Sequence, residues 1–109
     1  MAETLGPFEQ AVLLEIVRLA EGAYGRAVHR EVAERLGRDV AAGAVFSTLE
    51  RLEKKKFVIS RLGPGGDERG GRPRRYYAVQ PTGIRALNDS REMLDAIWRR
   101  IPKPLRADS

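Results

Sequence analysis

The chain has 109 residues, of which 42% are hydrophobic and 32% charged, as is typical of a single soluble domain. It contains no cysteine, no apolar run of the ~20 residues that a membrane span needs, and no secretory signal pattern at its N-terminus. Disulfides, cysteine-ligated zinc and thiol catalysis are therefore excluded, and we expect a cytoplasmic protein. The formal net charge is +5, and the basic excess is concentrated in residues 50–79, which favours an anionic polymer or surface as the partner.

The first predicted helix runs from Pro7 to Ala20 or Glu21. Val12 and Ile16 recur on one side at helical spacing, whereas Glu15 is expected on the solvent side. Gly22 is expected to end the helix as a left-handed cap. This helix has a structural role.

A second helix is predicted from about Arg26, with Val28, Val32 and Leu36 on its inner side and Gly37 at its end. His29, the single histidine, has no neighbouring ligands at a spacing suited to a metal, so we expect a surface residue.

The third predicted helix, residues 40–56, has two distinct faces. Val45, Leu49 and Leu52 form an apolar stripe that needs a core. The helix ends in three lysines, and its connection to the second helix is short, so the two form a helix-turn-helix pattern in which this one could enter a major groove. An ordinary amphipathic surface helix is the alternative. The second face consists of small or hydrogen-bonding residues: Gly43, Ala44, Ser47, Thr48 and Arg51.

Two strands are predicted next, at residues 57–62 and 74–79, around a loop rich in glycine and proline at residues 63–73. The loop lacks the Gly-Lys-Ser/Thr ending of a P-loop, so nucleotide binding is not expected. Either it is an arm that carries Arg69 and Arg72 along a groove, or it is a disordered loop with incidental arginines. Three helices and a hairpin predict a winged-helix domain over residues 1–80.

A last helix is predicted at residues 81–101, followed by a disordered tail at residues 102–109. The earlier helices already supply the apolar side chains of a core of this size, so we expect this helix to pair with a second copy. The alternative is that it folds back on its own domain. Trp98 could pack in that interface or line a pocket for a flat effector. The residues predicted to dimerise are Ile84, Leu87, Leu94, Ile97, Trp98 and Ile101.

Three segments together resemble the PadR-like family of winged-helix transcriptional regulators. They are Gly22-Ala23-Tyr24-Gly25, GAVFSTLERLEKKKFVISR at residues 43–61, and GRPRRYYAVQPTG at residues 71–83. The resemblance covers nearly the whole chain, from about Leu5 to Ile101. It implies a dimeric, repressor-type DNA-binding protein whose C-terminal helix dimerises.

The same resemblance implies roles for individual residues. The groove-facing surface would be formed by Gly43, Ala44, Ser47 and Thr48. Phosphate contacts would come from Tyr24, Arg51 and Lys54, and the wing would contribute Arg69, Arg72, Arg74 and Arg75. Strand alternation means that Arg74 and Arg75 cannot both point to DNA from one face.

The sequence also departs from the family pattern. The usual Gly-Thr-Leu-Tyr-Pro stretch is Gly43-Ala44-Val45-Phe46-Ser47 here, so two hydroxyl groups are missing. The usual glycine after the cationic turn is replaced within Lys54-Lys55-Lys56, which should alter the backbone of that turn.

The sequence therefore predicts a mainly α protein with a small β-hairpin, a winged helix-turn-helix plus a C-terminal dimerisation helix. Its predicted partners are double-stranded operator DNA and a second copy of itself, with a small-molecule effector left open. We expect no enzyme activity, metal or cofactor, since there is no paired carboxylate, activated nucleophile or ligand cluster. The alternative function is a winged-helix module for protein interaction or dimerisation without an operator.

Overall fold

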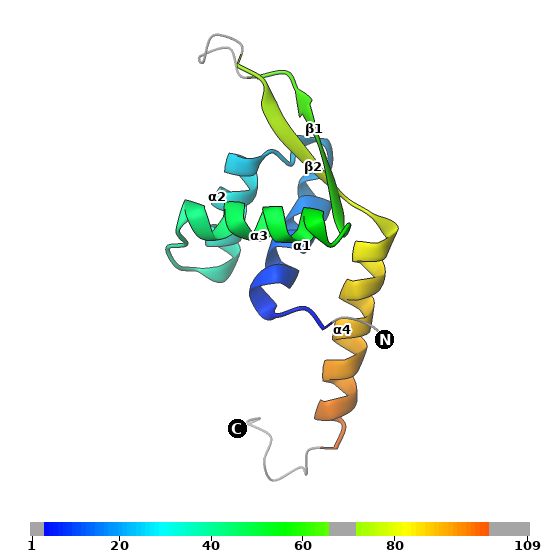
Figure 1. Cartoon of the computed structure of the whole chain (residues 1–109). Helices are drawn as coiled ribbons and strands as arrows, with labels where there is room; N and C mark the ends of the chain where they lie inside the picture. The colour runs from blue at the N-terminus through cyan, green and yellow to red at the C-terminus, as the bar shows by residue number, and fades with distance from the viewer. Residues whose placement is uncertain (1–3, 66–71, 101–109) are drawn as a thin grey trace.

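The computed structural model describes residues 4–65 and 72–100, which form four α-helices and a two-stranded antiparallel sheet (Figure 1). Three helices come first, the hairpin follows, and a fourth helix ends the described chain. This is the predicted winged-helix architecture with an added C-terminal helix. The elements are α1 (Pro7–Leu19), a 3-10 turn (Ala20–Gly22), α2 (Gly25–Leu36), α3 (Ala42–Lys54), β1 (Val58–Gly63), β2 (Arg74–Val79) and α4 (Pro81–Trp98).

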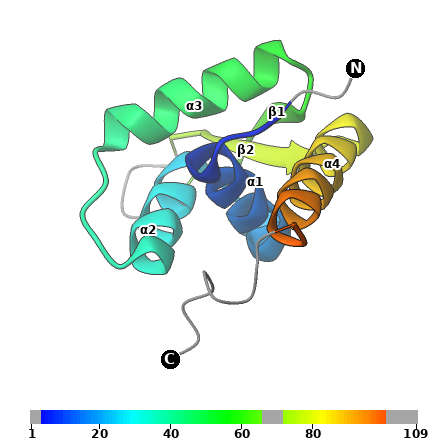
Figure 2. The ribbon, with the colours of Figure 1, turned by 90° about the horizontal axis from the view of Figure 1, so that it is seen from below.

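Helix α1 lies at the centre of the molecule, with α2 on one side, α4 on the other and α3 across it (Figure 2). Each element presents aliphatic side chains to this centre, and the stripes predicted for the first three helices are confirmed, except that Leu36 at the end of α2 is 37% exposed. Each buried Val, Leu or Ile contributes roughly 1.5–3 kcal/mol relative to an exposed one, so this packing fixes the orientation of α3. The core contains Val12, Leu13 and Ile16 of α1, Val28 and Val32 of α2, Val45, Leu49 and Leu52 of α3, Val58 of β1, and Ala86 and Leu87 of α4.

Glu15 was predicted to face solvent, and this prediction is wrong, because its side chain is buried between α1 and α2. One carboxylate oxygen accepts a hydrogen bond from Nε of Arg18 at 2.8 Å, and the other accepts one from Nε of Arg35 at 3.1 Å. The hydrogen bond that Arg18 donates to Glu15 raises the pKa of the Arg18 guanidinium. Two arginines compensate the buried charge, so the carboxylate links the two helices without an unpaired ion.

Three helix ends use left-handed or unusual backbone conformations. Gly37 ends α2 with φ +66°, as predicted. The cap predicted at Gly22 is wrong, because Ala20 takes the positive φ, +53°, at the end of α1. At the end of α3, Lys56 has φ +65°, and the N–H groups of Lys56 and Phe57 donate to the carbonyls of Glu53 and Leu52. This is a Schellman motif with a lysine where glycine is preferred, so the turn keeps a glycine-like backbone.

Replacing Lys56 by glycine should raise the free energy of unfolding by about 1 kcal/mol, because glycine adopts the left-handed region without the steric cost of a Cβ. Chemical denaturation with a constant m-value would measure the gain. The matched control is Gly37→Ala, which places a Cβ at φ +66° and should lower stability by a similar amount. A loss of stability in Lys56→Gly would contradict this account of the turn.

Strands β1 and β2 form an antiparallel hairpin. Its first residue pair is Val58 with Val79, and its last is Gly63 with Arg74. On its other edge β2 is bordered by the segment before α2, because the N–H of Tyr77 donates to the carbonyl of Ala23 at 2.8 Å. The strands thus form where the β-branched and aromatic residues predicted them, and this edge contact attaches the wing to the start of α2.

Helix α4 has two halves with different surroundings. Its first turns pack on the domain: Gly83 is buried so tightly that a Cβ there would lie 2.4 Å from the carbonyl oxygen of Phe57, and Ser90 Oγ accepts a hydrogen bond from the N–H of Leu5. Leu87, predicted to dimerise, is instead only 9% exposed in the core of its own chain. Beyond Ser90 the helix leaves the domain (Figure 1). Ile101 and the predicted tail, residues 102–109, lie outside the described residues.

Candidate nucleic-acid interface

Helix α3 turns its apolar stripe inward and its small residues outward. Gly43, Ala44 and Ser47 are exposed, as predicted for a groove-facing surface. Thr48 is not, because it is only 2% exposed, and its assignment to this surface is wrong. It follows Val45 by three positions and precedes Leu49, so it lies on the core side of the helix, where its hydroxyl accepts a hydrogen bond from Nη2 of Arg51 at 3.2 Å.

The outward side chains at the start of α3 are held in place by local contacts. The hydroxyl of Ser47 donates to the carbonyl oxygen of Gly43 at 2.8 Å, one turn back. The ring of Phe46, 41% exposed, lies against Gly25, where an added Cβ would come within 2.5 Å of Cε1 of the ring. Phe46 therefore couples α3 to the start of α2.

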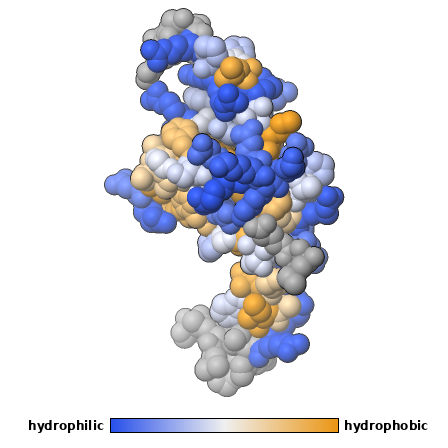
Figure 3. Space-filling model, in the orientation of Figure 1, coloured by the Kyte–Doolittle hydropathy of each residue, from blue (hydrophilic) through white to orange (hydrophobic). Residues whose placement is uncertain are grey.

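The second half of α3 is strongly charged. Arg51 and Lys54 are exposed, and Lys55 Nζ lies 3.6 Å from a carboxylate oxygen of Glu9 in α1. Figure 3 shows the division on the front of the molecule: pale orange and white atoms cover the beginning of α3, and blue atoms cover its far half. Exposed Glu50 and Glu53 offset part of this charge, but residues 50–56 hold four basic and two acidic groups and keep a net charge of +2, so this end favours an anion more than the uncharged first turns do.

The root of the wing is held by stacked aromatic and guanidinium groups. The guanidinium of Arg74 lies 4.0 Å from the ring centre of Tyr24, that ring meets Tyr76 edge to face at 5.8 Å, and Arg61 lies over Tyr76 at 5.2 Å. Tyr76 also donates its hydroxyl to the carbonyl of Pro64. We call Arg74, Tyr24, Tyr76 and Arg61 the wing-root stack. It fixes the direction of the wing relative to α2.

The two arginines at the start of β2 lie on opposite faces, as strand alternation predicts. Arg74 faces Tyr24, whereas Nη1 of Arg75 donates to Oγ of Ser60 at 3.0 Å. On the Arg75 face, burial raises the pKa of the Tyr77 phenol. Arg72 is exposed just before β2, and Arg69 lies outside the described residues.

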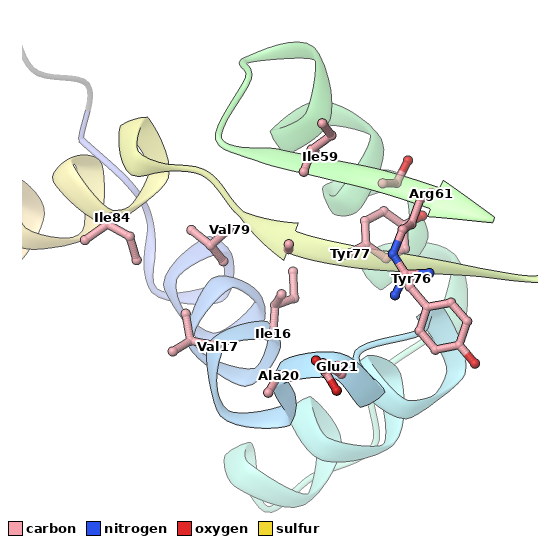
Figure 4. A pocket seen from close by; sticks show the side chains of 12 residues that line it. Ile16, Val17, Ala20, Glu21, Ile59, Arg61, Tyr76, Tyr77, Val79 and Ile84 are labelled. Atoms are coloured by element: carbon pink, nitrogen blue, oxygen red, sulfur yellow. The ribbon is translucent and has the colours of Figure 1, made fainter. Parts of the chain in front are cut away.

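A groove of about 540 Å³ lies beside the hairpin, on the side where α1 and the beginning of α4 meet (Figure 4). Its walls are mainly apolar, and Val17, Ile59 and Ile84 remain 40–54% exposed there. Only Ile84 was identified from the sequence as a surface residue with a function. The groove is lined by Ile16, Val17, Ala20, Glu21, Ile59, Ser60, Arg61, Tyr76, Tyr77, Ala78, Val79 and Ile84.

Other kinds of site find no support in the part of the chain that the structure describes. There, no three His, Asp or Glu side chains are grouped so that they could hold a metal ion. No helix of residues 4–65 or 72–100 is long and apolar enough to cross a membrane. His29, predicted at the surface, is half-buried, with Nε2 2.6 Å from the carbonyl oxygen of Val40.

A family model described as the transcriptional regulator PadR-like family matches residues 13–89. The chain belongs to the PadR-like family of transcriptional regulators. The resemblance predicted from the sequence is thereby confirmed.

Solved structures agree with this PadR-like assignment. A PadR family transcriptional regulator from Eggerthella lenta is 27% identical, with a TM-score of 0.67 over 89% of this chain and 82% of that chain. RosR from H. salinarum is 25% identical, with a TM-score of 0.67 over 94% of this chain and 84% of the RosR chain. A PadR-like regulator from Bacillus cereus, at 20% identity and a TM-score of 0.70 over 92% of both chains, is similar in fold. No curated protein gives a significant match.

In this PadR-like chain, most of the residues predicted to bind DNA lie on α3 or at the root of the wing. Arg74 and Tyr24 contact each other, so the two are brought together as one unit of the wing-root stack. Phe46 was noted only as a departure from the family pattern, yet its exposed ring is part of the α3 surface. Exposed residues of the predicted set are Gly43, Ala44, Ser47, Arg51, Lys54, Arg72 and Arg75.

Proposed function

We propose that this PadR-like protein binds double-stranded operator DNA as a homodimer in the cytoplasm and represses transcription there. The winged helix of residues 1–80 would bind the DNA, and the helix of residues 81–101 would pair the two copies. The observation that supports DNA binding best is the outer surface of α3, with small exposed side chains over its first turns and Arg51 and Lys54 after them. A helix in a major groove needs both properties.

In this proposal the beginning of α3 enters the major groove. Arg51 and Lys54 lie farther along the helix, where they would contact the backbone phosphates. Arg72 and Arg75 are exposed at the root of the wing and would follow the backbone or the minor groove, together with Arg69. Tyr24 would add a phosphate contact from the start of α2.

Replacing Arg51 by alanine should weaken DNA binding and lower the slope of log K against log salt by about 1, because one fewer phosphate is neutralised. Fluorescence anisotropy across a salt series would measure both quantities. The matched control is Arg85→Ala, which removes the same charge from an exposed site on the side of α4 that faces away from Leu87 and Leu94. Equal affinities and slopes for the two variants would remove Arg51 from the interface.

The second half of α4 supports the proposed homodimer. Leu94, Ile97 and Trp98 are 52%, 56% and 57% exposed, an apolar surface that no part of the described chain covers. A soluble protein seldom leaves such adjoining large side chains in water unless another molecule covers them. A second copy of the same helix is the proposed cover.

The groove beside the hairpin extends this argument to both ends of α4. Ile84 lines the groove, and Trp98 lies near the other end of the helix, roughly 21 Å away at 1.5 Å per residue. One chain cannot bring these two surfaces together. Two antiparallel copies of α4, related by a two-fold axis, would place each Trp98 beside the groove of the other chain.

Trp98 is the only tryptophan, so its fluorescence can report this pairing. We expect the emission to shift to shorter wavelength as the protein concentration rises through the dimerisation range, because the indole leaves water. Val17→Asp, in the groove, should reduce the shift, whereas Leu14→Asp, at an α1 residue that is exposed outside the groove, should reduce it less. If the sample is dimeric by sedimentation and its emission is still typical of exposed tryptophan, Trp98 does not lie beside the groove of the other chain.

Repression is tested with a reporter gene placed behind the promoter to which the protein binds in footprinting. The protein should protect sequence that overlaps the promoter and should lower reporter expression. Raised expression would indicate an activator instead.

A further inference from the structure

The first two turns of α3 offer almost no hydrogen-bonding side chain to a partner. Gly43, Ala44, Phe46 and Ser47, which we call the entry surface, are exposed there, as is Ala42 at the first position of the helix. The hydroxyl hydrogen of Ser47 is donated to the carbonyl of Gly43, and the next hydroxyl, on Thr48, is buried. What the entry surface presents is a methyl group, an aromatic ring edge, the acceptor oxygen of Ser47 and close access to the backbone.

The major groove can be recognised in two chemically different ways. Hydrogen bonds to base edges come mainly from Arg, Lys, Asn, Gln, Asp or Glu, none of which lies in the entry surface, and also from Ser or Thr, of which Ser47 offers only an acceptor oxygen. The other way is apolar contact with the C5-methyl group of thymine, for which Ala and Phe side chains are suited. Ala44 and Phe46 match the second way, whereas the first has only the acceptor oxygen of Ser47 and, one turn farther along the helix, the exposed carboxylate of Glu50.

Phe46 is also held in place for such a contact. Its ring packs against Gly25 at the start of α2 while 41% of the residue stays exposed, so the exposed edge has a fixed position. Ala44, two residues earlier, lies on the opposite flank of the outward face of the same helix and has no rotamers to lose. A rigid apolar contact loses little conformational entropy when it forms.

We propose that the entry surface selects DNA through the C5-methyl groups of thymine, with Ala44 and Phe46 as the side chains that contact them. Arg51 and Lys54 supply affinity that does not depend on sequence, since they meet phosphates. The inference rests on the proposed function, because it needs α3 to lie in the major groove. The cationic end of the same helix, Lys54 to Lys56, favours a nucleic acid over an apolar protein partner as the occupant of this surface.

The test uses an operator duplex in which single thymines are replaced by deoxyuracil. This change removes the C5-methyl group and keeps every hydrogen-bonding atom of the base pair. At one or more positions of each half-site the substitution should weaken binding about fourfold, the effect of losing one buried methyl group. At thymines outside the half-sites it should have no effect.

Two protein variants connect the effect to the residues. Phe46→Ala or Ala44→Gly should bind the thymine and deoxyuracil duplexes equally at the position that each residue contacts, while the other position keeps its discrimination. The deoxyuracil substitution is made in the DNA and is measured with the unaltered protein. The test of methyl recognition therefore remains valid even if one of the two protein variants is unstable.

The outcomes separate this inference from the function on which it rests. Specific operator binding that is unchanged by deoxyuracil at every position overturns methyl recognition and leaves the DNA-binding function intact. Binding that shows no preference for any duplex overturns both.

Discussion

Replacing Leu94 by glutamate is expected to convert the proposed dimer into monomers and to weaken operator binding by roughly a hundredfold or more, because two linked half-site contacts become one. Leu94 is 52% exposed in a single chain and takes no part in its core. In the proposed interface its replacement would bury a carboxylate among apolar side chains, which is strongly unfavourable without a partner. Sedimentation velocity gives the mass, and anisotropy gives the affinity.

The matched control for this variant is Leu94→Met, which keeps an apolar side chain of similar volume and should stay dimeric. Circular dichroism should show the same helix content for both variants. A glutamate variant that sediments as a dimer would contradict pairing through the second half of α4.

Replacing Ala44 by glutamate is expected to weaken DNA binding by more than a hundredfold at moderate salt, since a carboxylate would then approach the phosphates and base edges of the groove. Folding should not suffer. The site is exposed, and an acidic side chain in the first turn of a helix is favoured by the helix dipole by roughly 0.3–1 kcal/mol. The variant therefore separates binding from stability, with anisotropy for one and thermal unfolding for the other.

Ala44→Ser is the control at the same position, because serine is small and neutral and should retain most of the affinity. If the glutamate variant binds as tightly as the parent protein, α3 does not lie in the groove.

Local periodicity was sufficient to predict the helices, the hairpin and the inner face of α3. Val45, Leu49 and Leu52 are spaced so that they must share one side of a helix, and all three are buried. The same spacing could have placed Thr48 beside them. Its hydroxyl suggested a polar surface, but its position along the helix decides its burial.

Contacts between distant elements could not be predicted in this way. Glu15 is buried because Arg35 reaches it from another helix, and Leu87 is buried because the first half of α4 packs on its own domain. Leu87 and Leu94 were predicted together as dimerisation residues of one helix, although only Leu94 remains exposed. Likewise, the groove at Val17 forms where α1, the hairpin and α4 meet. The spacing of residues within one element does not predict how separate elements pack together.

The left-handed turn at Lys56 illustrates a conformation that the surrounding structure imposes on an unfavourable residue. The missing glycine suggested a changed backbone, yet the hydrogen bonds that end α3 hold lysine in the conformation that glycine prefers. Packing of Leu52 and Val58 on either side of the turn offsets this local cost.

The most direct test of the central proposal is fluorescence anisotropy with DNA from upstream of the protein's own gene, beside a scrambled duplex, each across a salt series. Tighter binding to the native duplex at physiological salt, with a slope that corresponds to several released counterions, is the predicted result. Equal and weak binding to both duplexes would contradict a specific regulator of that operator and would favour a winged-helix module that binds another protein.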